Sequence, residues 1–228
     1  MFNLTYSEFE SQTLEKKAII LPIGSFEQHS TYATLATDAI IATEIGKLVS
    51  AQMNIPCIPT IPFGRSKVHK SFFGAIYFED ETLEKVIKDI INSLAHYNIT
   101  NFIIINGHGG NIPIINNVIK QYQESELNFY PFSWWELIKD KFFDKEHSSH
   151  ASSEEISVLV AIDEGLIRPL LVQDMIPNPS FQGKKFSDVR EVTLNGVLGK
   201  SSKYSKYTGV QIMSYVVNII CEQLEKEL

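Results

Sequence analysis

Short apolar runs alternate with amphipathic segments along most of the chain. Residues 18–23 (AIILPI) and 101–105 (NFIII) are almost wholly apolar, which is the pattern of strands covered on both faces. The aromatic-rich run at 127–134 predicts a further strand. Between these runs apolar residues recur at helical spacing, as at 81–97. This order predicts the α/β class, with a mostly parallel central sheet and helices on both faces.

Capping and turn signals set the expected limits of the other elements. Thr5-x-x-Glu8 matches a capping box, and Thr37 and Asn111 are expected N-caps. The expected helices are, in chain order, about 5–15, one from 37, 81–97, one from 112, 135–144, one after Ser152 that stops before Gly165, and 207–225. Three prolines in 56–63 indicate an edge or irregular strand. Loops are expected at 168–207, with a short hairpin at 191–197.

Length and composition indicate one globular domain, 1–228. The chain has 228 residues, of which 44% are hydrophobic and 21% charged, as is ordinary for a globular protein. The net charge of −7 argues against nucleic acid or an anionic membrane surface as a partner. No apolar run reaches the roughly 20 residues that span a bilayer, and no signal peptide is recognised. Two cysteines without metal-site or redox spacing read as buried thiols, so a cytoplasmic protein is expected.

Candidate metal ligands follow the first buried strand. Glu27 and His29 lie two residues apart, and Asp38 opens the next helix. Residues two apart in an extended segment point to the same side, and ligands of α/β proteins gather beyond the carboxyl ends of strands. Zinc, manganese and iron accept this ligand set. A polar loop with an incidental histidine is the alternative, and a carboxylate in a first helical turn is favoured without any metal.

A glycine-rich turn follows the strand at 101–105. Residues 106–111 read NGHGGN, which places His108 between a strand and a helix. Glycines let a backbone approach a ligand closely, and His108 is expected to point into the same crevice as Glu27 and His29. A phosphate-binding turn or a plain tight loop is the alternative. The sequence has neither a G-x-G-x-x-G motif nor a P-loop lysine.

Two further segments carry candidate chemistry. Glu155 is adjacent to the apolar stripe of its helix, where a buried carboxylate must be paired or bind metal. Ser152-x-x-Glu155 could instead be only a capping box. The loop at 64–78 has no regular period, and its His69 and Lys70 are candidates for contact with a substrate or another subunit, or are surface residues.

Together these motifs resemble the creatininase family of creatinine amidohydrolase-like enzymes. The matching stretches are Leu21-Pro22-Ile23-Gly24-Ser25-x-Glu27-Gln28-His29, Thr37-Asp38, Asn106-Gly107-His108-Gly109-Gly110-Asn111, His150-Ala151-x-x-x-Glu155-x-Ser157, Ser66-x-x-His69-x-x-Phe72-x-Gly74 and Gly196-Val197-Leu198-Gly199. The resemblance implies a three-layer α/β/α sandwich with two divalent metal ions per chain (Zn, Mn or Fe), usually in a homo-oligomeric hexamer. It implies that the metal ligands are Glu27, His29, Asp38, His108 and Glu155, with Asp38 bridging.

The resemblance also implies an activity. His150 would be the general acid or base, with Glu155 beside it as a second catalytic residue. The expected enzyme is a metal-dependent amidohydrolase that uses metal-activated water on a non-peptide C–N bond of a small molecule, an amide, formamide or cyclic amide. The alternatives are a peptidase that trims a modified peptide and a non-catalytic member that acts as a binding or assembly subunit.

Several positions depart from the family pattern. Ser30 and Ser152 replace usual glycines, and Tyr32-Ala33-Thr34 replaces a usual His-Leu-Pro. Creatinine hydrolases carry a metal-binding glutamate where this chain has Gly110, and a Trp-Asp pair near Glu146-His147. Creatinine is therefore not the expected substrate.

Overall fold

Three parallel strands form the centre of the protein, as seen in a computed structural model that describes residues 4–139, 141–144, 148–175 and 186–228. The strands are β1 (Ala18–Ile23), β2 (Asn101–Asn106) and β3 (Asn128–Ser133), and they are ordered β1-β2-β3. Their register pairs Ala18 with Asn101, and Asn101 with Asn128. The predicted parallel sheet is confirmed.

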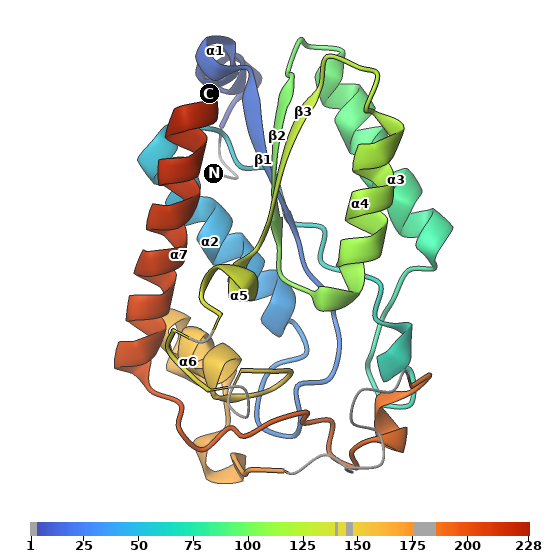
Figure 1. The fold of residues 1–228 in the computed structure, drawn as a ribbon, viewed down its shortest axis with the longest axis vertical. Coiled ribbons are helices and arrows are strands. Elements are labelled where there is room, and N and C mark those ends of the chain that lie inside the picture. Colours follow the sequence, from blue (N-terminus) through green and yellow to red (C-terminus); the bar gives the residue numbers. More distant parts are fainter. Residues whose placement is uncertain (1–3, 140, 145–147, 176–185) are drawn as a thin grey trace.

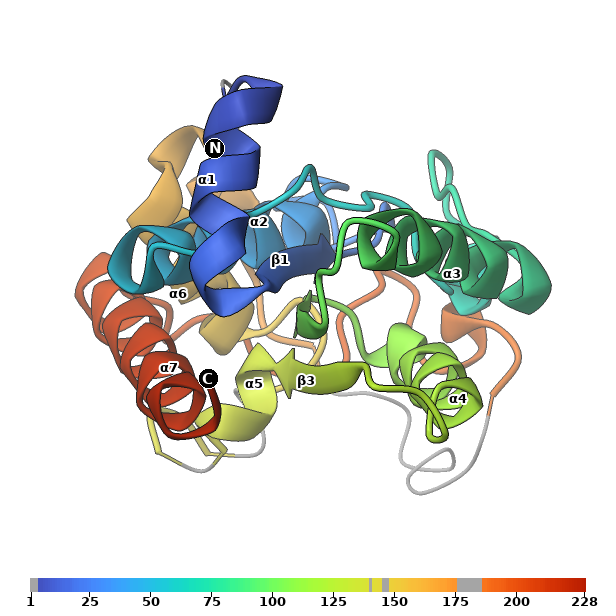
Figure 2. The ribbon, with the colours of Figure 1, turned by 90° about the horizontal axis from the view of Figure 1, so that it is seen from above.

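Helices cover both faces of this sheet (Figure 1). They are α1 (Tyr6–Lys16), α2 (Thr37–Met53), α3 (Asp80–Ala95), α4 (Ile112–Gln121), α5 (Trp134–Leu137), α6 (Ser153–Ile162) and α7 (Lys206–Glu227). Viewed from above, the sheet lies between α3 and α4 on one side and α2, α6 and α7 on the other (Figure 2). The α/β sandwich expected from the sequence is confirmed.

The core is divided between the two faces because side chains of a strand alternate in direction. Ile20 and Ile103 belong to the apolar cluster that includes α2, α6 and α7. Ile19 and Phe102 belong to the cluster that includes α3 and α4. All four side chains have no exposed surface, which explains why the strand sequences read as continuous apolar runs rather than as alternating ones.

The proline-containing segment 56–63 runs beside β1 without becoming a regular strand. It makes isolated parallel bridges at Cys57 and Ile61. The Ile20 amide donates to Pro56 O at 2.9 Å, and the Ile61 amide donates to Pro22 O at 3.0 Å. Prolines have no amide hydrogen to donate, so a continuous ladder cannot form. The expected edge or irregular strand is thus found as an irregular one.

The predicted caps are confirmed in part. The capping box of Thr5 and Glu8 is present. The N-cap of α2 is Ala36 rather than Thr37, whose hydroxyl donates to Thr34 O. Asn111 occupies the N-cap position of α4 as expected, but its side chain makes no capping bond because it contacts Arg65 and Gly24.

Two other predicted elements differ from the structure. The helix expected at 135–144 is only the four-residue α5, followed by turns in the described part of that range. The hairpin expected at 191–197 is absent from these described residues, which contain the end of a 3-10 helix, Val189–Glu191, and then turns. Local apolar patterns could not reveal these outcomes, because both segments make contacts with residues distant in the sequence: Phe142 packs on Tyr215 of α7, and Gly196 O accepts from Gln28.

The carboxyl ends of the strands point toward the lower half of Figure 1, where the loops after β1 and β2 meet α6. Helix α6 is held there by close packing against α7. A Cβ atom on Gly209 of α7 would lie 1.8 Å from Ser157 O of α6, so only glycine permits this approach. Within the described residues, no helix has the length and apolar character that a bilayer crossing requires.

Candidate metal centre

Two glycines bring the start of α2 against the ends of β1 and β2. A Cβ atom on Gly24 would lie 2.3 Å from Ala39 Cα, and one on Gly107 would lie 2.2 Å from Asp38 O. Any larger residue would push the helix away, so the bare backbone at these two turns places Asp38 between the strand ends. Asp38 is thereby positioned beside residues that come from both strands.

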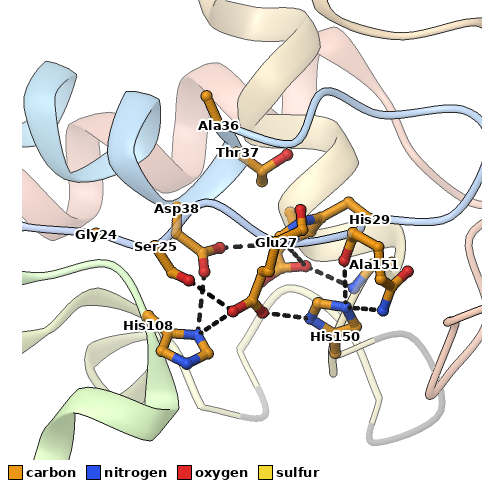
Figure 3. A network of polar contacts seen from close by, with 12 residues as sticks. Gly24, Ser25, Glu27, His29, Ala36, Thr37, Asp38, His108, His150 and Ala151 are labelled. Carbon is orange, nitrogen blue, oxygen red and sulfur yellow. Dashed lines mark hydrogen bonds and ion pairs between the residues drawn. The ribbon is translucent and has the colours of Figure 1, made fainter. Parts of the chain in front are cut away.

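The carboxylates and histidines expected to bind metal lie within contact distance of one another. His29 Nε2 is 3.1 Å from Asp38 Oδ1, and His108 Nδ1 is 3.1 Å from Asp38 Oδ2. His108 Nδ1 is also 3.2 Å from Glu27 Oε2. Figure 3 shows the Glu27 carboxylate between the rings of His108 and His150, with Asp38 beside them. One proton on His108 cannot satisfy two carboxylate oxygens at once, whereas a cation can.

The burial of these groups fits a bound cation. Glu27 and His29 have no exposed surface, and Asp38 is 2% exposed. In the described part of the chain, Glu27 Oε1, His29 Nε2 and Asp38 Oδ2 are buried and make no hydrogen bond of regular geometry. Each has only ion-pair contacts with other titratable groups there, the nearest at 3.1 to 3.2 Å. Buried polar atoms without a well-formed hydrogen bond are costly. Oxygen and imidazole nitrogen donors converging in this way match the ligand chemistry of zinc, manganese and iron.

Two more groups of potential ligands share residues with this one. Glu27 meets His69 and His150, and His29 meets His150 and Glu155, with the ligand atoms of each group within 4.8 Å of one another. Overlapping groups of this kind provide enough donors for more than one ion.

Glu155 faces the centre rather than acting as a capping-box partner. Its Oε2 is 3.6 Å from His29 Nε2 and accepts a 2.6 Å hydrogen bond from the Ala151 amide. Ser152 precedes α6 but makes no side-chain cap bond to the helix. The reciprocal contacts of a capping box are therefore not formed, and the structural alternative for Glu155 loses its support.

Mutual electrostatics hold Glu27, His29 and His108 in charged forms. Burial alone would raise the pKa of Glu27, but His108 and His69 bring that pKa well below its usual range. Burial would lower the pKa of His29, yet Asp38 and Glu155 raise that pKa to about 9. Against burial, Glu27 and Asp38 likewise raise the pKa of His108. In the metal-free protein these histidines therefore carry protons that a metal ion would have to displace.

The two candidates for proton transfer are shifted in opposite directions. Burial, followed by the neighbouring His29 and His69, lowers the pKa of His150 well below its usual value. Burial raises the pKa of Glu155 to about 8, despite the opposing effect of His29. At neutral pH this leaves a neutral imidazole and a protonated carboxyl next to each other, which is an arrangement able to accept and to donate a proton.

A cavity of about 240 Å³ opens onto these groups. Its other walls include the side chains of Trp134, Trp135, Phe186 and Leu198. Glu27, Asp38, His108 and His150 all line it, together with His69. A small substrate could therefore reach the ligand candidates while contacting aromatic and aliphatic surface. Glu146 and His147, which stand near the position of the Trp-Asp pair of creatinine hydrolases, lie outside the described residues.

Sequence reasoning left open or missed three residues of this site. His69, for which no role was chosen, is 4% exposed, and its Nε2 is 3.2 Å from Glu27 Oε1. Ser25 donates to Glu27 Oε2 at 2.7 Å. Gln28 contacts both His69 and His150. Only the position of Gln28 between two ligand candidates could have drawn attention to it, because its partners are far away in the sequence.

The departures from the family pattern are accommodated in the structure. Ser30 has the left-handed backbone, with φ of 61°, that a glycine would adopt more easily. The Tyr32 hydroxyl donates to Ala151 O at 2.6 Å, next to His150. At Gly110, a Cβ atom would lie 2.3 Å from Arg65 O, so this turn has no room for a glutamate. None of these substitutions removes one of the five ligand candidates.

Comparisons with known proteins point to one family. The sequence profile of the creatininase family, described as creatinine amidohydrolase, matches residues 3–224. A mycofactocin precursor peptide peptidase from Mycobacterium ulcerans is 29% identical over 66% of this chain, which corresponds to 60% of that relative's length. The creatinine amidohydrolase of Pseudomonas putida is 22% identical, covering 98% of this chain and 95% of that enzyme.

A solved structure has the same fold. A creatininase mutant of the Zn–Zn type superimposes with a TM-score of 0.88 at 22% identity, and the match covers 100% of this chain and 97% of that one. At this level of identity the likeness concerns the fold.

Proposed function

This chain belongs to the creatininase family, and on that premise we propose that it is a metal-dependent hydrolase of amide C–N bonds. The observation that carries the proposal is the set of buried donors at the strand ends. Glu27, His29 and Asp38 each present a buried atom there that makes no regular hydrogen bond and faces only other titratable groups among the described residues, and the cavity reaches two of these residues. A stable fold has little reason to bury such atoms together unless a cation binds them.

We propose that two divalent ions bind at this centre. Glu27, His29, Asp38, His108 and Glu155 would hold them, with Asp38 shared because its two oxygens face different histidines. Bound ions of this kind polarise a carbonyl and lower the pKa of a water molecule. The protein's own contribution is to fix the ligands and to shield them from solvent.

His150 and Glu155 are proposed to move protons. The lowered pKa of His150 keeps its ring neutral at pH 7, so it can accept a proton from the attacking water. Glu155, whose pKa is raised in the metal-free protein, would hold a proton for the departing nitrogen only while it is released from the metal ion, because a bound carboxylate is ionised. Both groups lie near His29: the His150 ring is 4.4 Å from the His29 ring, and Glu155 Oε2 is 3.6 Å from His29 Nε2.

The proposed substrate is a small amide, formamide or cyclic amide. The cavity volume of about 240 Å³ suits such a molecule. Peptide trimming is the second candidate, and it is supported by the likeness to the mycofactocin precursor peptide peptidase. Creatinine is not proposed, because Gly110 stands where creatinine hydrolases carry a metal-binding glutamate. A cytoplasmic homo-oligomer, such as a hexamer, remains part of the proposal.

The experiment is to measure metal content and hydrolysis on the same preparations. Protein purified without added metal or chelator should contain about two divalent ions per chain and hydrolyse at least one member of a panel of formamides, cyclic amides and short peptides. Glu27→Ala and His108→Ala should lose both metal and turnover while the far-UV circular dichroism is unchanged. His96→Ala is the matched control, because His96 is exposed and remote from the cavity.

Two outcomes would contradict the proposal. A protein that neither contains metal nor takes it up would leave the buried donors without a catalytic role. A metal-loaded protein that hydrolyses none of the panel would favour the non-catalytic alternative, a binding or assembly subunit.

A further inference from the structure

The side-chain amide of Gln28 lies between two imidazoles of the site. Gln28 is 3% exposed. Its Oε1 accepts a 2.8 Å hydrogen bond from the Ser30 amide, which can only donate. This contact identifies the oxygen of the amide, so the other atom must be Nε2, which can only donate.

Nε2 of Gln28 has two hydrogens but three neighbours that could accept one. It is 3.0 Å from His69 Nδ1, 3.0 Å from Gly196 O and 2.8 Å from His150 Nε2. His150 Nε2 is also 2.8 Å from Gln28 O, a carbonyl that can only accept. If His150 Nε2 donates to that carbonyl, the two hydrogens of Gln28 go to Gly196 O and His69 Nδ1, so each of these three acceptors receives a hydrogen. The 2.8 Å approach of Gln28 Nε2 to His150 Nε2 is then a contact between two donors.

The close approach of Gly196 to Gln28 requires a glycine. A Cβ atom on Gly196 would lie 1.7 Å from Gln28 Oε1, and its φ of 88° is a conformation that favours glycine. The loop that carries Gly196 can therefore bring its carbonyl to the amide only because no side chain intervenes.

This arrangement fixes the tautomer of His69. A ring nitrogen that accepts a hydrogen bond from a donor-only group carries no proton, so the proton of neutral His69 must be on Nε2. That nitrogen faces Glu27 Oε1 at 3.2 Å. An Nε2–H group can donate to the carboxylate, but it cannot ligate a metal ion, which needs the lone pair of an unprotonated nitrogen.

The same arrangement gives His150 the opposite tautomer. With its proton on Nε2, neutral His150 presents an unprotonated Nδ1 to Glu27 Oε1, at 3.5 Å. The two rings lie 4.7 Å apart. At Glu27, His69 thus presents an N–H donor and His150 presents an unprotonated ring nitrogen.

We propose that Gln28 is a positioning residue that fixes His69 as a hydrogen-bond donor to the Glu27 carboxylate, so that His69 supports a metal ligand without being one. This inference rests on the proposed function, because it assigns Glu27 to the metal centre. His69 belongs to a group whose spacing would suit a cation. It is the hydrogen-bonding pattern, rather than distance, that separates the supporting histidine from the ligands.

The test is to read the ring protonation of His69 directly. Protein labelled with 15N-histidine would be examined by long-range 1H–15N correlation, both metal-free and loaded with zinc, and the His69 signal would be assigned by its loss in His69→Gln. We expect a proton on Nε2 and none on Nδ1 in both states. In Gln28→Glu, whose carboxylate can only accept, the proton of His69 should move to Nδ1.

Kinetics of paired variants provide a second readout. His69→Leu should retain zinc at saturation but lose about 10–100-fold in kcat, the usual cost of removing a residue that supports a metal ligand, with little change in KM. His69→Gln keeps a donor amide and should lose much less. The same two substitutions at exposed His96 are the controls.

The proposal would be overturned if His69 Nε2 proved to be unprotonated and bound to zinc, or if the proton lay on Nδ1 in the wild-type protein. Equal kcat losses in His69→Gln and His69→Leu would also contradict it. Failure of the wild-type protein to bind zinc would contradict the proposed function instead. The tautomer of His69 would still be readable in the metal-free protein, so the two failures are distinguishable.

Discussion

Two residues with left-handed backbone adjoin histidines of the site. Ser30 follows His29 and has φ of 61°, and Ala151 follows His150 and has φ of 55°. For residues other than glycine this conformation costs roughly 1–2 kcal/mol. The cost is concentrated where the chain must turn sharply to aim an imidazole inward, which is where strained backbone is commonly found in functional sites.

Replacing Ser30 with glycine should stabilise the protein. Ser30→Gly relieves the left-handed strain but gives the unfolded chain more freedom, which offsets part of the gain, so we expect about 0.5–1 kcal/mol. The hydrogen bond from the backbone amide to Gln28 Oε1 is retained. Urea unfolding would measure the change, with Ser30→Ala, which keeps the strain, as the control. A Ser30→Gly variant no more stable than Ser30→Ala would contradict this account.

The turn between β2 and α4 has no room for a side chain at one of its two adjacent glycines. Its glycines are not equivalent, although they are adjacent in the sequence. A Cβ atom on Gly109 would meet only Trp135 Cζ2, at 3.9 Å, which is ordinary contact. On Gly110 it would lie 2.3 Å from Arg65 O and 2.4 Å from His108 Nε2. The loop at Arg65 therefore occupies the space that a side chain at 110 would need.

The same substitution should have different effects at the two glycines of this turn. Gly110→Ala should cost about 1–3 kcal/mol through overpacking and reduce metal content by displacing His108, whereas Gly109→Ala should be close to neutral. For the same reason Gly110→Glu should not produce a creatinine hydrolase. Thermal unfolding, metal analysis and a creatinine assay would check these outcomes. Gain of creatinine hydrolysis in Gly110→Glu would show that the Arg65 loop moves aside readily.

At the scale of the whole molecule, the fold brings titratable groups from separate segments into one buried cluster. Glu27 and His29 follow β1, His108 follows β2, and Glu155 lies on α6. Without metal, the folded protein holds protons on this cluster that the unfolded chain would release near neutral pH. Folding and pH are therefore coupled through the site.

The metal-free protein should lose stability as pH rises from about 6.5 to about 9. The pKa of His29 is about 9 in the folded state, against about 6.5 when unfolded. The pKa of His108 is also raised, and that of Glu155 is about 8. The folded state then binds more protons than the unfolded state in this window, so deprotonation favours unfolding.

Zinc should reverse this trend, because it binds the deprotonated ligands and so stabilises the folded protein more at pH 9 than at pH 6.5. Thermal unfolding at the two pH values, with chelator and with zinc, would measure both effects. Metal-free stability that did not change across this window would mean that the carboxylates do not hold protons on the histidines.

The sequence by itself determined the strands, most helices and the candidate ligands. Continuous apolar runs identify strands buried on both faces, and Glu27, His29, Asp38 and His108 stand directly beyond strand ends or at a helix start. These signals are local, because periodicity and strand-end position are carried by neighbouring residues.

Only the tertiary structure decided how these residues are used. The contacts of Gln28 reach residues 41, 122 and 168 positions away in the sequence. Asn111 occupies the N-cap position of its helix as expected, but its side-chain amide donates to Gly24 O, 87 positions away, rather than capping the helix. A polar side chain takes whichever partner the fold brings within reach, so its role depends on distant segments. The sequence therefore supplied the ligand candidates, while the fold selected the partners of their side chains.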